Sequence, residues 1–268
     1  MNNQNDPKVV VPNPWDSLKQ FTPARIALGR AGTSLPTRAS LDFQLAHALA
    51  RDAVHIPVDF AELEQRLHFM GYQTLTLRTR AENQQMYLQR PDLGRLLSES
   101  ALDSLQQSAP ISADAVVVVA DGLSSKAIEQ HAEPLLSLLL PELQQRGYRL
   151  PPVSLVKHGR VAIADAIAEQ YAARLCMVFI GERPGLSSPD SMGIYFTYQA
   201  RSGISTDADR NCISNIHKNG LSYEQALKKL LYLLTEAEKL QLSGVNLKDE
   251  TTDTIANDQQ KRGNFLLD

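Results

Sequence analysis

Four apolar runs in the second half of the chain predict the strands of a sheet. Residues 115–120 (AVVVVA) form a continuous, mostly β-branched run, which is typical of a strand covered on both faces. Residues 153–156 predict a second, shorter strand, and residues 175–180 (LCMVFI) predict a third. Residues 192–198 predict a fourth. The second half of the chain is therefore expected to be organised around a buried sheet.

The segments between these runs predict the fold class. Helical patterns extend from Lys126 to Gly147 and over residues 161–173, and Pro141 is expected to break or kink the first of them. Because right-handed crossovers make successive strands parallel, the first three strands are expected to be parallel, with helices on both faces. The sequence therefore predicts an α/β fold with a Rossmann-like, mostly parallel sheet, preceded by a small, mainly helical N-terminal region.

The remaining patterns predict the domain organisation. A clear helix starts at Thr37, a second covers residues 60–70, and residues 73–78 alternate polar and apolar side chains like a half-buried strand. Near the other end, residues 222–225 form a capping box that opens a last helix. The predicted regions are a loose arm at 1–22, a mainly helical region at 23–110, an α/β domain at 111–248 and a disordered tail at 249–268.

Three polar segments follow or closely trail the buried runs. They are HGRV at 158–161, GERPG at 181–185 and RNCISNIH at 210–217, the last of them inside a long polar segment, 199–221, that is predicted to be a loop. Ligands of open α/β sheets bind at the carboxyl ends of the strands. These segments therefore predict one wall of a cofactor site.

Two residues in these segments carry alternatives that their types alone leave open. Glu182 either forms an ion pair with Arg183 that stiffens a tight turn or accepts hydrogen bonds from a large ligand. Cys212 is either a small buried apolar residue or a ligand contact.

Two further features also allow more than one interpretation. Asp121-Gly122 lies where a strand meets a helix N-terminus, so it is either an anion or ligand site or a plain turn capped by a following serine. Arginines gather at residues 78–95, and Arg90 and Arg95 flank a Pro-Asp turn. They are either solvated or form a contact with a partner chain or an anionic group.

Composition and missing motifs exclude several classes of function. The net charge of −3 gives no basic excess for nucleic acid, and no apolar run approaches the ~20 residues of a membrane helix. Two cysteines fit a reduced, cytoplasmic setting. No phosphate-binding loop, G-x-G-x-x-G, H-E-x-x-H, C-x-x-C or G-x-S-x-G motif is present. We therefore expect no catalytic and no metal-ligating residue, which favours a chain that completes a site on a partner.

Long, unusual motifs carry a resemblance to a known family. The chain resembles the small (light) subunit of ethanolamine ammonia-lyase, an adenosylcobalamin-dependent enzyme. The matching stretches are ARIALGRAG (24–32), LQRPDLGR (88–95), VVVADGLSS (117–125), KHGRVAIADAI (157–167), IGERPGLSSPDS (180–191) and DADRNCISNIHKNG (207–220).

The resemblance implies a cofactor, a partner and three site residues. In that family the small subunit holds part of the cobalamin and docks on a large subunit, a TIM barrel that converts ethanolamine to acetaldehyde and ammonia by a radical mechanism. The implied cobalamin contacts are Val161, Glu182 and Cys212, with no catalytic acid or base on this chain. The family keeps the cofactor's own dimethylbenzimidazole on cobalt, and no histidine here follows an Asp by two residues.

Two other hypotheses stay open. One is a cobalamin-holding or assembly module without lyase activity, and the other is an independent α/β enzyme with a nucleotide cofactor, against which the missing phosphate loop counts. Some members of the family have a longer N-terminal extension that is associated with a bacterial microcompartment. The expected location is the cytoplasm or such a microcompartment, and the short segment of about twenty loose residues before the matched region counts against encapsulation.

Overall fold

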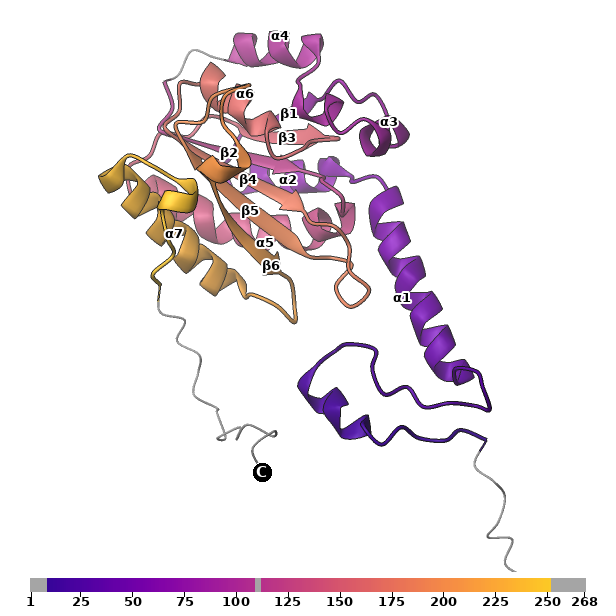
Figure 1. Ribbon diagram of the computed structural model, residues 1–268. Coiled ribbons are helices and arrows are strands. Elements are labelled where there is room, and N and C mark those ends of the chain that lie inside the picture. Colours follow the sequence, from indigo (N-terminus) through magenta and orange to yellow (C-terminus); the bar gives the residue numbers. More distant parts are fainter. Residues whose placement is uncertain (1–8, 109–111, 252–268) are drawn as a thin grey trace, which may run out of the picture.

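The computed structural model describes residues 9–108 and 112–251, which form a six-stranded sheet with helices on both faces (Figure 1). The strand order is β1-β3-β2-β4-β5-β6. The strands are β1 (Thr74–Arg78), β2 (Ala115–Ala120), β3 (Val153–Lys157), β4 (Leu175–Gly181), β5 (Met192–Tyr198) and β6 (Arg210–Ile216). The helices are α1 (Thr37–His55), α2 (Phe60–Phe69), α3 (Gln84–Gln89), α4 (Glu99–Ser108), α5 (Ser125–Gln145), α6 (Ile163–Gln170) and α7 (Tyr223–Leu240).

The sheet is mixed, so the expectation of a mostly parallel, Rossmann-like sheet is confirmed only in part. Strands β1, β3, β2 and β4 are parallel, as predicted for the three of them that follow residue 111. Strands β5 and β6 each run antiparallel to their neighbour. The connections before β5 and β6 contain no α-helix, so the chain turns back directly and the strand direction reverses. The α/β class is confirmed.

Strand β6 corrects the expectation that residues 199–221 form a loop. Only Arg210, Ile213 and Ile216 of this strand are buried, and the side chains between them are polar or partly exposed. The strand is the last in the sheet, and its pairing with β5 is irregular near Met192 and Ile194. An edge strand that is half exposed lacks the continuous apolar run by which the buried strands were recognised.

The expected break at Pro141 is also wrong, because α5 continues through both Pro134 and Pro141. A proline inside a helix costs about 3 kcal/mol. Buried leucines on both sides of Pro141, including Leu140 and Leu143, pack the helix against the sheet and outweigh this cost.

The strand predicted at residues 73–78 is confirmed as β1, and it pairs in parallel with β3 at one edge of the sheet. The segment expected to be mainly helical therefore also supplies a strand. The capping box of the last helix is confirmed, with Ser222 accepting from the backbone N–H of Gln225. The predicted disordered tail lies mostly outside the described residues.

Two apolar clusters fill the faces of the sheet. One lies between the sheet and helices α2, α5 and α7, and the other lies under α4 and α6. The strand side chains alternate between them, so that Ile194 and Phe196 of β5 join the first cluster while Tyr195 packs against the second. This alternation decides which side chains of β5 and β6 face the α6 side.

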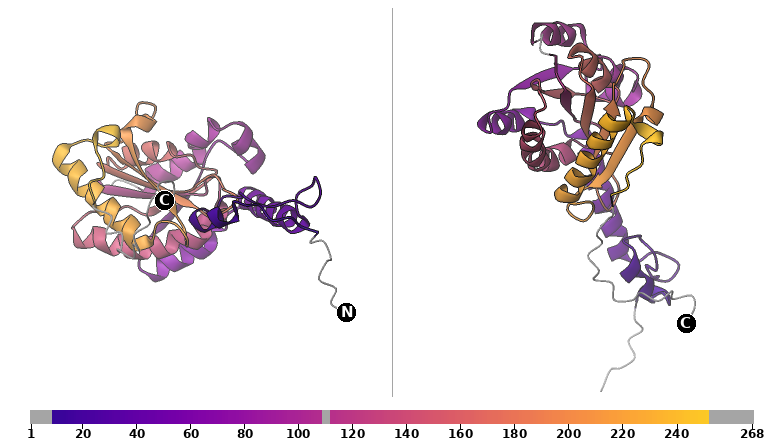
Figure 2. Two further views of the ribbon diagram at one scale, coloured as in Figure 1. Left: turned by 60° about the horizontal axis from the view of Figure 1, so that its bottom comes forward. Right: turned by 90° about the vertical axis from the view of Figure 1, so that its left-hand side faces the viewer.

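Helix α1 projects away from the sheet, and residues 9–36 lie beside its far end (Figures 1 and 2). Leu41, Leu45 and Leu49 form an apolar stripe on one side of this helix and are exposed, and Ala53 is the one buried residue of α1 in the described structure. No helix in the described parts of the chain is both long and apolar enough to cross a membrane.

Candidate functional site

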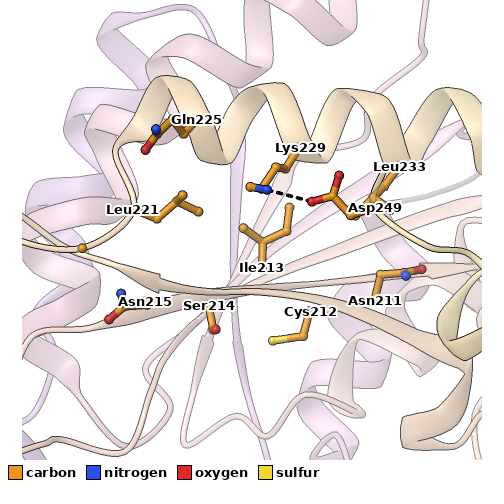
Figure 3. Close-up of a pocket in the computed structure, with 11 residues that line it drawn as sticks. Asn211, Cys212, Ile213, Ser214, Asn215, Leu221, Gln225, Lys229, Leu233 and Asp249 are labelled. Carbon is orange, nitrogen blue, oxygen red and sulfur yellow. Dashed lines mark hydrogen bonds and ion pairs between the residues drawn. The ribbon is translucent and has the colours of Figure 1, made fainter. Parts of the chain in front are cut away.

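Among the described residues, no helix covers a strip of the sheet on the α6 side. Helix α6 packs mainly over β2 and β4, and α4 packs near β1. Helix α6 contacts β6 at Arg210, the first residue of the strand, through Asp165. On β6, Cys212 and Ser214 are exposed, whereas Ile213 between them is buried on the other face. Figure 3 shows Ile213 pointing toward α7 and the side chains of Cys212 and Ser214 pointing the opposite way. We call this strip of β5 and β6, with the end of β4, the open face.

Glu182 lies at the end of β4, and its carboxylate turns back over the open face. It accepts a short hydrogen bond from the Ser191 hydroxyl and another from the backbone N–H of Asn215 at 3.2 Å. A Cβ on Gly193 would lie 2.9 Å from the Glu182 Oε1, so glycine at this position leaves the space that the carboxylate occupies. The alternative of an ion pair with Arg183 is therefore not what the structure shows.

Tyr195 and Cys212 are cross-strand partners on the open face. Burial raises the pKa of Tyr195 to about 12, with smaller contributions from Cys212 and Glu182. Desolvation likewise raises the pKa of Cys212. Both groups are therefore neutral at pH 7, and the thiol is exposed rather than the buried apolar residue that the sequence left open.

Val161 borders a cavity of about 510 Å³ that adjoins the open face. Tyr195 also lines this cavity, as do Arg95, Arg160 and Arg210. Tyr195 thus links the two parts of the site, since it borders the Val161 cavity and contacts Cys212 beside Glu182. The structure brings the three predicted residues together around a tyrosine that sequence reasoning had not selected.

The turn that carries Val161 is fixed by Asp121. Its buried carboxylate accepts hydrogen bonds from the backbone N–H groups of His158 at 2.8 Å and Gly159 at 3.0 Å. It also accepts from its neighbour Gly122 at 2.9 Å. The helix that follows is capped by Ser124, which accepts from the Ala127 N–H. The structure therefore favours the turn interpretation of Asp121-Gly122 over a ligand site.

Helix α6 is tied to β6 by a buried ion pair. Arg210 donates to both oxygens of Asp165, at 2.7 and 2.6 Å, and each side chain is only 2 % exposed. Arg210 also donates to the Thr197 hydroxyl at 3.1 Å. This pair fixes the distance between Val161, which precedes α6, and the strand that carries Cys212.

A second cavity of about 450 Å³ lies between β6 and α7 (Figure 3). Lys229 and Asp249 form an ion pair of 2.9 Å across it, and Ile213 points into it. It lies on the opposite side of β6 from the thiol of Cys212. Within the described residues, no cluster of three or more His, Cys, Asp or Glu side chains is arranged to hold a metal ion.

Comparison with known proteins identifies the family. The family model described as ethanolamine ammonia-lyase light chain matches residues 12–248. An ethanolamine ammonia-lyase small subunit of Pseudomonas paraeruginosa is 52% identical over 271 residues, which cover 100% of this chain and 99% of that protein. Small subunits of Pseudomonas fluorescens (53% over 261 residues, 95% of each chain) and Ralstonia nicotianae (51% over 265 residues, 98% and 97%) are similarly close. The resemblance drawn from the motifs is therefore confirmed, and the chain belongs to the ethanolamine ammonia-lyase light-chain family.

Proposed function

We propose that this chain is the small subunit of an adenosylcobalamin-dependent ethanolamine ammonia-lyase. It holds one side of the cobalamin on the open face and docks on a large subunit that converts ethanolamine to acetaldehyde and ammonia. The observation that carries the proposal is the gathering of Glu182, Tyr195 and Cys212 on a sheet face that no helix covers, beside Val161. Family membership supports it.

The chemistry of the open face fits the rim of a corrin ring, which carries neutral amide side chains. A carboxylate offers about four acceptor positions, and the Glu182 carboxylate uses two of them within the chain. It can therefore accept further hydrogen bonds from ligand amides. Tyr195 and Cys212 stay protonated at neutral pH, so they add no charge that would have to be desolvated.

The open face is suited to binding rather than to acid–base catalysis. The raised pKa values of Tyr195 and Cys212 leave neither group ionised near pH 7. The bound cofactor supplies the homolytic cobalt–carbon chemistry. The residues of this chain hold the cofactor and exclude water on one side, and the groups that bind ethanolamine belong to the large subunit.

The exposed apolar side chains of residues 9–56 support docking on a large partner. Large apolar side chains of this segment that are at least two-fifths exposed are Val9, Val10, Val11, Trp15, Phe21, Leu35, Leu41, Phe43, Leu45, Leu49 and Ile56. Helices in proteins gain most of their stability from packing an apolar face. Since α1 buries only Ala53 in the part of the chain that the structure describes, the large subunit is proposed to cover its apolar stripe.

Co-expression with a large subunit and adenosylcobalamin tests the proposed function. We expect the complex to release acetaldehyde from ethanolamine, and neither subunit alone to do so. A complex that binds cobalamin but is inactive, beside an active complex of a related small subunit, would favour the alternative of a cobalamin-holding or assembly module. Location in the cytoplasm or in a microcompartment remains a prediction.

Replacing Glu182 by alanine is expected to weaken cobalamin binding by the complex about tenfold or more. Hydrogen bonds to a charged group contribute about 1.5–3 kcal/mol, and about 1.4 kcal/mol corresponds to a factor of ten. Equilibrium titration of the purified complex with cobalamin measures the effect. The cobalamin affinity of Glu182→Gln should lie between those of Glu182→Ala and the unchanged chain, because glutamine keeps one acceptor oxygen.

Glu99→Ala is the matched control, because Glu99 is an exposed residue at the start of α4. It should leave the affinity unchanged. If Glu182→Ala lowered only the melting temperature and left cobalamin affinity intact, the carboxylate would have a structural role alone.

A further inference from the structure

The cavity beside Val161 has more positively charged than negatively charged side chains in its lining. Arg95, Arg160 and Arg210 border it, and its one acidic lining residue is Asp207. Arg210 is already neutralised by Asp165. The guanidinium groups of Arg95 and Arg160 are paired with no carboxylate in the described part of the chain, and they leave the cavity with an unbalanced positive charge.

Arg160 is held in place before any ligand binds. Its guanidinium carbon lies 4.2 Å from the centre of the Tyr87 ring, and its Nη2 donates to the Tyr87 carbonyl at 3.4 Å. A Cβ on Gly94 would come within 2.9 Å of the Arg160 side chain, so the glycine permits this close approach. Gly94 of the segment 88–95 thus leaves room for Arg160, and the same segment contributes Arg95 to the cavity. Of the two interpretations of these arginines, this placement favours a contact with an anionic group.

Donors without acceptors point to a ligand in the cavity. The Nε atoms of Arg160 and Arg210 are buried and have no hydrogen-bond partner, and the Arg210 side chain is 2 % exposed. Val161 and Ala162, which precede α6, are among the residues that line the cavity, and their backbone N–H groups have no acceptor among the described residues. A buried donor without a partner costs about 1–3 kcal/mol. N–H groups at the start of a helix favour an anion.

We propose that this cavity is an anion subsite that takes the phosphodiester of the cobalamin nucleotide tail. The inference rests on the proposed function, and it adds Arg95 and Arg160 as residues that bind the cofactor. Arginine is suited to this task because its donors match the oxygens of a phosphate. The subsite adjoins the open face through Tyr195, so one ligand reaches both.

A comparison of two corrinoids tests the subsite in the complex with the large subunit. Cobalamin carries the phosphodiester, whereas cobinamide has the same corrin ring and lacks the nucleotide tail. We expect Arg95→Met and Arg160→Met each to weaken cobalamin binding about tenfold and to change cobinamide binding less than about twofold. The loss corresponds to one charge-assisted contact.

Arg90→Met is the matched control. Arg90 belongs to the same segment but is paired with Asp92 at 2.8 Å and does not line the cavity. It should leave the affinity for both corrinoids unchanged. Arg95 is exposed, so its replacement leaves the folded core intact and keeps the test interpretable if Arg160→Met destabilises the chain.

Competition with inorganic phosphate provides a second test of the subsite. Phosphate should compete with cobalamin in the unchanged complex, compete less with cobinamide, and lose its effect in Arg95→Met. Equal losses of cobalamin and cobinamide affinity in the arginine variants would overturn the subsite while leaving the proposed function in place. Phosphate that binds without weakening cobalamin would show a site for free phosphate and also overturn it. A complex that binds neither corrinoid would overturn the proposed function as well.

Discussion

Replacing Arg210 by methionine is expected to lower the free energy of unfolding by about 3–5 kcal/mol. The variant leaves the Asp165 carboxylate without its partner, and that side chain is 2 % exposed. The Thr197 hydroxyl also loses a hydrogen bond. A buried charge without compensation is among the largest single losses that a fold can suffer. Urea denaturation of the full chain, followed by circular dichroism, measures the change.

The double variant Arg210→Met with Asp165→Leu distinguishes two causes of lost stability, the loss of the ion pair and a general packing defect. Removing both charges and filling the space with apolar groups is often neutral or stabilising. We therefore expect the double variant to recover at least half of the lost stability. A double variant as unstable as Arg210→Met alone would show that the ion pair is not what joins α6 to β6.

Replacing Gly181 by alanine is expected to cost about 3 kcal/mol of stability and to weaken cobalamin binding. A Cβ at this position would collide with the carbonyl oxygen of Ser124 and lie 2.6 Å from that of Asp121. These neighbours are backbone atoms, which cannot rotate away as a side chain can. Gly181 also accepts a hydrogen bond from Leu123 at 3.0 Å, so the end of β4 is fitted directly to the turn that opens α5.

The weaker binding follows from the position of Gly181 next to Glu182. A shift of the strand end moves the Glu182 carboxylate away from its place over Gly193. Gly185→Ala is the matched control, because its nearest neighbour would lie at 3.7 Å. That control should change stability by less than about 0.5 kcal/mol. Equal stabilities of the two glycine variants, measured by thermal unfolding, would contradict the close fit.

The sequence predicted β2 and β4 from their continuous apolar runs and β1 from its alternation of polar and apolar residues. In β2 and β4 every side chain is buried, so the whole strand is apolar and stands out from its surroundings. Strand β6 was missed because one of its faces is exposed and carries Cys212 and Ser214. Because one face of β6 is exposed, its sequence lacks a continuous apolar run, and the same exposure makes that face available to a ligand.

The candidate site was predicted in part. The segments that carry Val161 and Glu182 were predicted because they follow buried strands, where α/β sheets place their ligands. Within its segment, Val161 was named only by the family resemblance. Tyr195 was missed because its role depends on the pairing of β5 with β6, which sets it beside Cys212. No local pattern encodes that pairing. The role of Arg160 likewise depends on the packing of Tyr87 and Gly94, which are distant in the sequence.

The most direct test of the central proposal is the structure of this chain in complex with its large subunit and cobalamin. We predict that the rim of the corrin ring lies over β5 and β6, with its amide groups within hydrogen-bonding distance of the Glu182 carboxylate and beside Val161 and Cys212. A corrin ring bound away from this face, with the Glu182 carboxylate still accepting from Ser191 and Asn215 and from no ligand amide, would contradict the proposal.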